Sequence, residues 1–406
     1  MTNAETSRLQ VINIESLALT NGAHLLLKKA LRDLSPGERL GVCGTAPELA
    51  VHLRGWCRAQ GHEFLPDERG NVTAWIIRGT AINGRWNEAV RTGAVNPAEP
   101  NAVQEAPPLQ WGLAARGATM EAGGPAFYYP LHDKGLVWAD NAPKLYAQAV
   151  AAQWNPNTAI DWAAEFTLDD EVETAVVQVM TYLIENENAA LQVPAKFIAQ
   201  IHPHFREVLQ LLALQVADEA RHVEVFTHRA TLRGKPLGVS TVSGQQSLKT
   251  LLDEPEFALA SFLLSVLGEG TFLHLLWFLE QHAPDPVTQQ IARLVVQDEA
   301  RHVAFGMSHL QYQIAHDPHL RERLAAAMAR RHDALLQTAG LNEEVFDALI
   351  LLAAGSWEPD AIAAGFAKTQ ALKAEMHAGR KSRLLKLGFP PAQANELSAL
   401  HTRNFM

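Results

Sequence analysis

The pentapeptide Asp-Glu-Ala-Arg-His occurs twice in the chain, at residues 218–222 and again at residues 298–302. In each copy a glutamate and a histidine are three positions apart, Glu219 with His222 and Glu299 with His302. On a helix, side chains at i and i+3 leave the same face. The neighbours on that face are apolar, and burying a carboxylate and an imidazole is costly unless something pairs with them. A bound metal ion would provide that pairing.

Two further glutamates are candidates for the same site. Glu269 interrupts the apolar segment SFLLSVLGEGTFLHLLWF and has apolar neighbours one turn away in both directions. In an earlier helical segment the choice lies between Glu187 and Glu185, which point about 200° apart on a helical wheel. Glu187 has apolar residues at i−4, i−3, i+3 and i+4, whereas Glu185 has mostly polar ones. We therefore take Glu187 as the ligand and keep Glu185 as the alternative.

This set of side chains matches what a four-helix bundle needs to hold two metal ions. Such a bundle supplies one glutamate from each of two helices and one Glu-x-x-His pair from each of the other two. Four carboxylates and two imidazoles favour iron, with manganese as the alternative, over zinc or copper. The predicted metal ligands are Glu187, Glu219, His222, Glu269, Glu299 and His302.

The spacing of apolar residues and of Pro and Gly predicts the helices that would position these ligands. Four long helices are expected at about 169–200, 204–232, 255–282 and 286–316, followed by shorter helices to the C-terminus. We predict that residues 142–406 form one mainly α-helical domain, a four-helix bundle with extra C-terminal helices.

The first part of the chain has a different organisation. Strand-like and helical patterns alternate over residues 1–80 in the order βαβαββ, which predicts a small two-layer α+β domain. Residues 81–141 are rich in Pro, Gly and Trp without clear periodicity. We expect an ordered connector there, because Trp111, Tyr128 and Trp138 need to be buried.

The order Glu, Glu-x-x-His, Glu, Glu-x-x-His on successive helices resembles the ferritin-like di-iron carboxylate proteins. These include the bacterial multicomponent monooxygenase hydroxylases, the ribonucleotide reductase small subunits and the acyl desaturases. The resemblance covers residues 142–316 and implies a ferritin-like bundle with two iron ions. It also implies roles at the catalytic site for four flanking residues. Asp218 and Asp298 would orient the metal-bound imidazoles, and Arg221 and Arg301 would balance their charge.

The segment LRDLSPGERLGVCGTAPELAVHLRGWCRAQGHEF resembles the TusA-like sulfur-carrier family. That family carries sulfur on a Cys followed by Pro at the start of the first helix, but this chain has Leu19 to Ala23 there and no cysteine. The two cysteines of the chain, Cys43 and Cys57, are expected to be ordinary buried thiols. A degenerate carrier domain would then dock a partner or pack against the rest.

Composition narrows the class of partner. The 406 residues carry a net charge of −10, which disfavours nucleic acid. The longest apolar stretch, residues 257–268, is too short to span a membrane. Two cysteines and no secretory signal pattern favour a cytoplasmic protein. The expected partners are a small-molecule substrate, dioxygen and an external electron donor such as a ferredoxin or reductase. A homodimer is also compatible with the sequence.

These observations favour an oxygen-dependent oxidoreductase, specifically a monooxygenase acting on a small organic molecule. Phe226, Phe272 and Phe305 are candidates to line an apolar pocket beside the metals. The alternatives are a ferritin-like protein for iron storage or detoxification, and an accessory protein that docks a sulfur-relay or carrier partner.

Overall fold

The computed structural model describes residues 10–80, 86, 88–336 and 343–400. The chain forms two compact units. One contains residues 1–95 and 116–125, and the other contains residues 96–115 and 126–406. Much of the segment predicted as a connector therefore belongs to the second, helical unit. Within it Trp111 and Trp138 are buried as expected, but the expectation for Tyr128 was wrong, since this side chain is 86% exposed.

The first unit contains a four-stranded sheet and two helices in the predicted order βαβαββ. Its elements are β1 (Gln10–Asn13), α1 (Ala23–Arg32), β2 (Arg39–Cys43), α2 (Leu49–Gln60), β3 (Glu63–Pro66) and β4 (Ala74–Ile77). The strand order is β1-β2-β4-β3, with β1 parallel to β2 and the other pairs antiparallel. Buried apolar residues of both helices and of the strands share one core.

Local backbone chemistry sets the ends of α2. Gly61 ends the helix in the left-handed conformation (φ 73°), and its N–H donates to the carbonyl of Cys57. The helix begins at Leu49, immediately after Glu48, whose φ of 53° is also positive. A short antiparallel pair of strands, β5 (Val90–Arg91) and β6 (Thr119–Met120), also belongs to this unit.

The second unit is mainly α-helical. Short helices precede the bundle: η2 (Leu109–Trp111), α4 (Lys134–Val137), α5 (Ala142–Ala151) and α6 (Pro156–Ala159). The bundle elements are α7 (Asp170–Ile198), α8 (Arg206–Thr231), α10 (Phe257–Ser261), η4 (Phe262–Glu269), α11 (Gly270–His282) and α12 (Pro286–His316). Two connecting helices are η3 (Pro203–Phe205) and α9 (Val242–Leu252). The C-terminal helices are α13 (Leu320–Leu336), α14 (Glu343–Ala354), α15 (Pro359–Lys386) and α16 (Pro391–Ala399).

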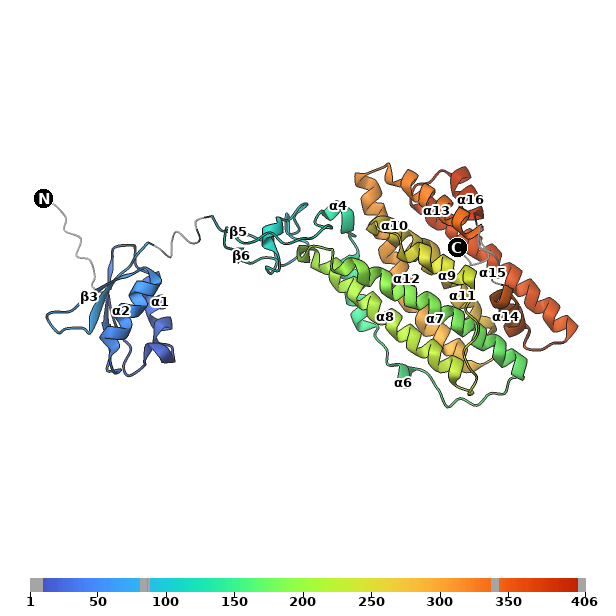
Figure 1. The fold of residues 1–406 in the computed structure, drawn as a ribbon, viewed down its shortest axis with the longest axis horizontal. Helices are drawn as coiled ribbons and strands as arrows, with labels where there is room; N and C mark the ends of the chain where they lie inside the picture. Colours follow the sequence, from blue (N-terminus) through green and yellow to red (C-terminus); the bar gives the residue numbers. More distant parts are fainter. Residues whose placement is uncertain (1–9, 81–85, 87, 337–342, 401–406) are drawn as a thin grey trace. The chain divides into compact units, whose positions relative to one another are not determined.

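The bundle is ferritin-like and confirms the predicted fold class. α7 packs along α8, α11 packs along α12, and α8 also contacts α12, so the two hairpins face each other (Figure 1). The four long helices lie within two residues of their expected ends. The extra helices α14 and α15 cover α7 and α11.

The third bundle helix has a feature that was not expected. Between α10 and α11 the backbone forms a π-helix, η4, which ends at Glu269. The continuous helical run Phe257–His282 has the length and composition of a membrane span, but 89% of its apolar window is buried inside the protein. This run is therefore the core helix of the bundle, and Glu269 lies at its centre.

Candidate metal centre

Six side chains from four helical segments meet in the middle of the bundle. Glu187 comes from α7 and Glu269 from the end of η4. The two Glu-x-x-His pairs come from α8 and α12. All six are buried, with at most 4% of each residue exposed: Glu187, Glu219, His222, Glu269, Glu299 and His302. The bundle thus brings together every metal ligand predicted from the sequence.

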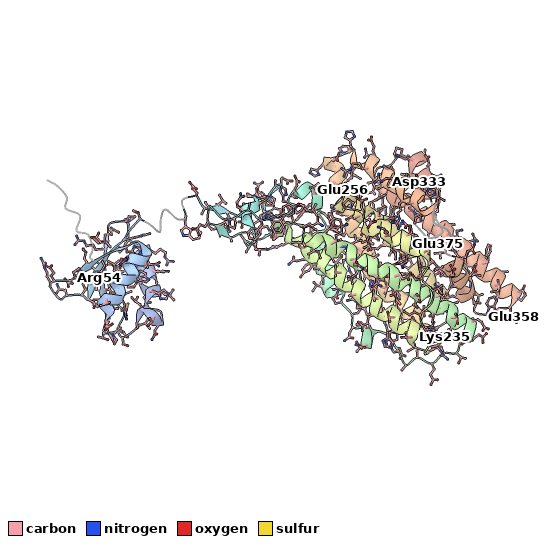
Figure 2. All side chains as sticks on the ribbon, in the orientation of Figure 1. Arg54, Lys235, Glu256, Asp333, Glu358 and Glu375 are labelled. Atoms are coloured by element: carbon pink, nitrogen blue, oxygen red, sulfur yellow. The ribbon has the colours of Figure 1, made fainter. Side chains whose placement is uncertain are left out.

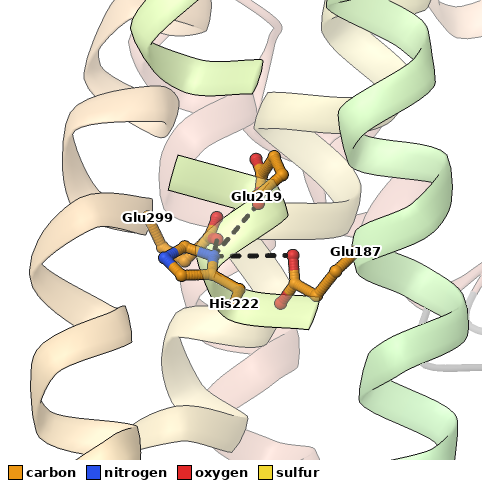
Figure 3. Close-up of side chains that lie close together, drawn as sticks. All are labelled: Glu187, Glu219, His222 and Glu299. Atoms are coloured by element: carbon orange, nitrogen blue, oxygen red, sulfur yellow. Dashed lines mark hydrogen bonds and ion pairs between the residues drawn. The ribbon is translucent and has the colours of Figure 1, made fainter. Parts of the chain in front are cut away.

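The six side chains form two overlapping groups, in each of which the ligand atoms lie within 4.8 Å of one another. One group contains Glu187, Glu219, His222 and Glu299 (Figure 3). The other contains Glu219, Glu269, Glu299 and His302. Glu219 and Glu299 belong to both groups, so each could bridge two ions. Glu185, the alternative on α7, is half-buried and belongs to neither group.

Distances between the side chains show which atoms face the centre. The Nδ1 atom of His222 lies 3.1 Å from a carboxylate oxygen of Glu219 and 3.2 Å from one of Glu299. It lies 3.7 Å from an oxygen of Glu187. The Nδ1 atom of His302 lies 3.1 Å from the other oxygen of Glu219 and 3.5 Å from the other oxygen of Glu299. Both imidazoles therefore direct Nδ1 toward the shared carboxylates.

Several of the atoms that face the centre lack hydrogen-bond partners. Among the described residues, buried atoms without a hydrogen bond include Oε1 of Glu219, Oε2 of Glu269, both oxygens of Glu299 and Nδ1 of His302. Leaving so many buried polar atoms unpaired is costly, and two cations would satisfy them. Four carboxylates also balance the charge of two divalent ions. The residues fit a dinuclear centre whose hard, oxygen-rich ligands suit iron or manganese.

The aspartates and arginines of the two pentapeptides form a network behind the histidines. The Nε2 atom of His222 lies 3.2 Å from Asp298, and that of His302 lies 3.3 Å from Asp218. Each aspartate thus contacts the histidine of the other pentapeptide. Arg221 contacts both aspartates, at 2.5 and 2.9 Å, and Arg301 also forms ion pairs with both. The predicted orienting and charge-balancing contacts are present, but they cross between α8 and α12.

Three further residues support the site and were not found from the sequence. Gln153 donates to Asp218 at 2.9 Å, and the indole N–H of Trp154 donates to Asp298 at 2.8 Å. Both follow α5, far from the bundle helices in sequence, so no local pattern indicated them. Gln215 donates to Glu269 at 2.9 Å. Its place four residues before Glu219, on the same face of α8, was the one available signal.

The protein environment shifts the pKa values of the ligands strongly. Burial raises the pKa of Glu187 and of Glu269 well above the usual glutamate value, and nearby carboxylates add to the shift. Burial alone would lower the pKa of His222. Its contacts with Asp298 and with the surrounding glutamates outweigh burial and raise that pKa well above its ordinary value. Without metal the site therefore retains protons, which metal binding would displace.

The cavity beside the ligands differs from the expected pocket. It has a volume of about 20 Å³, and of the three phenylalanines only Phe272 lines it. Phe226 and Phe305 are fully packed in the core. A space of this size accepts a molecule such as water or dioxygen and excludes a larger organic compound. Its walls consist of Asn186, Glu187, Ala190, Leu248, Leu251, Leu264, Gly268, Glu269, Phe272 and Glu299.

The bundle and its ligand set together define a ferritin-like di-metal carboxylate protein. No protein-family model and no curated protein matches the chain. Solved structures of R2-like ligand-binding oxidases are similar to it. A variant with a Mn/Fe cofactor is 21% identical over 61% of this chain and 94% of its own, with a TM-score of 0.47. A variant with an Fe/Fe cofactor is 20% identical over the same shares, with a TM-score of 0.48.

Proposed function

We propose that this protein is an oxygen-activating di-metal oxidoreductase, and specifically a monooxygenase that oxygenates a small organic molecule. The observation that supports this function most directly is the small cavity next to Glu187, Glu269 and Glu299. It gives a diatomic molecule access to the ligands while the surrounding core excludes bulk water. Two bound ferrous ions would supply the electrons that reduce dioxygen.

The residues of the chain have distinct tasks in this function. Glu219 and Glu299 belong to both groups of ligand atoms and would help to hold both ions. Asp298 and Asp218 accept from Nε2 of the histidines and so fix Nδ1 toward the centre. Leu264 and Phe272 help to keep the cavity apolar. An organic substrate would need this cavity to widen, since 20 Å³ is too small to contain one.

The test measures dioxygen uptake by protein loaded anaerobically with two ferrous ions per chain. The expected result is rapid uptake that is absent in the double variant His222→Ala with His302→Ala. Twenty ferrous ions per chain are then added in air. In a monooxygenase, the rapid oxidation of ferrous ions ends after about two ions per chain have reacted. Continued rapid oxidation with a ferric mineral would instead show iron storage, and no uptake at all would overturn both functions.

Monooxygenation also needs an external electron donor. Insertion of one oxygen atom into a C–H bond and reduction of the other to water consume two electrons that the substrate does not supply. For that partner we propose an acidic electron-transfer protein that docks on the first unit. Helices α1 and α2 contain no Asp or Glu, yet they expose Lys28, Lys29, Arg32, Arg54 and Arg58 (Figure 2 labels Arg54).

Charge reversal tests the docking proposal. The double variant Lys28→Glu with Lys29→Glu should slow reduction of the metal centre by reduced ferredoxin about tenfold at low salt, and the difference should shrink at high salt. Reduction by dithionite should not change. Arg69→Glu, an exposed arginine outside both helices, is the matched control. Equal rates for both variants with ferredoxin would rule out docking at this face.

A further inference from the structure

The π-helical segment η4 needs support from outside its own backbone. In a π-helix the N–H groups bond to carbonyls five residues earlier instead of four, and the return to α-helix disturbs the regular ladder. η4 returns to α-helix at Gly270, immediately after Glu269. In this stretch the carbonyl of Val266 accepts a hydrogen bond of 2.7 Å from Nε of Arg383. A side chain from the C-terminal helix α15 thus bonds to the backbone of η4.

The guanidinium group of Arg383 also lies directly against the backbone at Gly270. A methyl group on Gly270 would lie 2.5 Å from Nε and 2.7 Å from Cζ of Arg383, so any larger side chain at this position would displace the guanidinium group. Helix α15 packs along both η4 and α11, so Arg383 reaches the junction between them. The contact therefore fixes the backbone at the residue that follows the metal ligand.

Helix α12 holds the same segment from another side. Its Gly306 lies against Ser265 of η4, and a methyl group on Gly306 would lie 2.5 Å from Cβ of Ser265. Gly306 is one helical turn beyond the ligand His302. The π-helical segment is thus held between two helices, and only one of them, α12, itself carries metal ligands.

Arg383 is buried at a cost that packing alone does not explain. Only 8% of the residue is exposed, and no carboxylate among the described residues forms an ion pair with it. A buried cation without a counter-ion is expensive. Its hydrogen-bond partner is instead the backbone carbonyl of Val266, three residues before Glu269. Arg383 is thus a buried cation whose hydrogen bond goes to the backbone of η4, which indicates a role in the geometry of that segment.

We propose that Arg383 is a positioning residue for Glu269. It acts through the backbone of η4 and holds this ligand in the ion site formed with Glu219, Glu299 and His302. Gln215 binds Oε1 of Glu269, which leaves Oε2 free for the ion. This inference rests on the proposed di-metal function, because it assigns Arg383 to one of the two ion sites.

The experiment is a titration of Mn²⁺ into the metal-free protein, in which calorimetry measures the heat of binding. Wild type should bind two ions per chain. Arg383→Leu should weaken the binding of one ion by about 10- to 100-fold and leave the other within a few-fold. Arg383→Lys, which keeps a charged donor, should restore part of the loss. Arg380→Leu is the matched control, because Arg380 is also buried on α15 but donates to the carbonyl of Ser398 in the C-terminal helices.

Hydrogen exchange of the metal-free variants adds a readout that does not involve metal. Exchange over residues 262–271 should accelerate in Arg383→Leu and not in Arg380→Leu. If Arg383→Leu does not fold, Gly270→Ala should produce the same selective loss of one ion. Binding of both ions as in wild type, or equal losses in Arg383→Leu and Arg380→Leu, would overturn the positioning role. A wild type that binds no Mn²⁺ would instead contradict the proposed di-metal function.

Discussion

At the scale of single residues, the choice between Glu187 and Glu185 shows how sharply the helix discriminates between neighbouring acids. Glu187 is 4% exposed and shares a group of ligand atoms with His222, whereas Glu185 is half-buried outside the centre. We predict that Glu187→Ala lowers the iron content after reconstitution to about one ion per chain or less. Glu185→Ala should leave it near two, as measured by elemental analysis. The reverse result would mean that α7 is rotated in solution.

A second residue-scale prediction concerns His309, two turns beyond His302 on α12. This side chain is fully buried and packs against Phe257 and Phe305, and burial lowers its pKa to about 4. The unfolded chain takes up this proton near pH 6.5, so between pH 6.5 and 4 the unfolded state binds more protons. The free energy of unfolding therefore decreases as the pH is lowered through that window. His309 should account for about 2 kcal/mol of the loss between pH 7 and 5.

The measurement for His309 is chemical unfolding of the helical unit at pH 7 and at pH 5, monitored by circular dichroism. His309→Gln removes the titrating group and keeps a polar side chain. The variant should be less stable than wild type at pH 7, but its free energy of unfolding should fall less steeply toward pH 5. An unchanged pH dependence would show that His309 does not titrate in this range.

At the scale of helices, a buried ion network joins α7, α8 and α12 away from the metal centre. Arg229 donates to Glu173 at 2.7 Å, to Asp285 at 2.9 Å and to Thr288 at 2.9 Å. All four residues are at most 2% exposed. Arg229→Met would leave two buried carboxylates without their cation. We predict a loss of about 3–5 kcal/mol in the stability of the helical unit.

An exposed ion pair provides the control for this prediction. Lys235, labelled in Figure 2, lies 2.7 Å from Asp170 at the start of α7, and the Asp170 side chain is 83% exposed. Lys235→Met should cost less than about 1 kcal/mol, because water and salt screen such pairs. Urea unfolding of both variants makes the comparison. Similar small losses would mean that the network around Arg229 adds little to the packing of the three helices.

The helices and the ligands could be predicted from the sequence because both depend on local periodicity. Apolar spacing located the bundle helices, and the i, i+3 pairs located four ligands on their inner faces. The π-helix η4 could not be predicted, because one inserted hydrogen-bond step leaves the apolar pattern of residues 257–282 unbroken. Trp154 and Arg383 were missed for a different reason. Trp154 contacts Asp298 from the segment between α5 and α6, and Arg383 contacts the backbone of η4 from α15, so both roles depend on tertiary packing alone.

At the scale of the whole molecule, the two units should respond differently to removal of metal. The four buried carboxylates of the centre lie in the helical unit, and metal bound there stabilises only that unit. At a free ion concentration 100 times the Kd, one ion adds about 2.7 kcal/mol. We predict that chelation lowers the melting temperature of the helical unit by several degrees and leaves the transition of the first unit unchanged. Differential scanning calorimetry would show this, and equal shifts in both transitions would contradict it.

The crossed contacts between the two pentapeptides have a consequence for how the sequence can change over time. Because Asp298 orients His222 and Asp218 orients His302, a mutation in one pentapeptide alters the surroundings of the histidine in the other. Neither copy can drift alone without impairing both ion sites. The two segments, 80 residues apart, are therefore expected to evolve together. Among relatives of this chain, we expect substitutions at 218 and 298 to occur together or not at all.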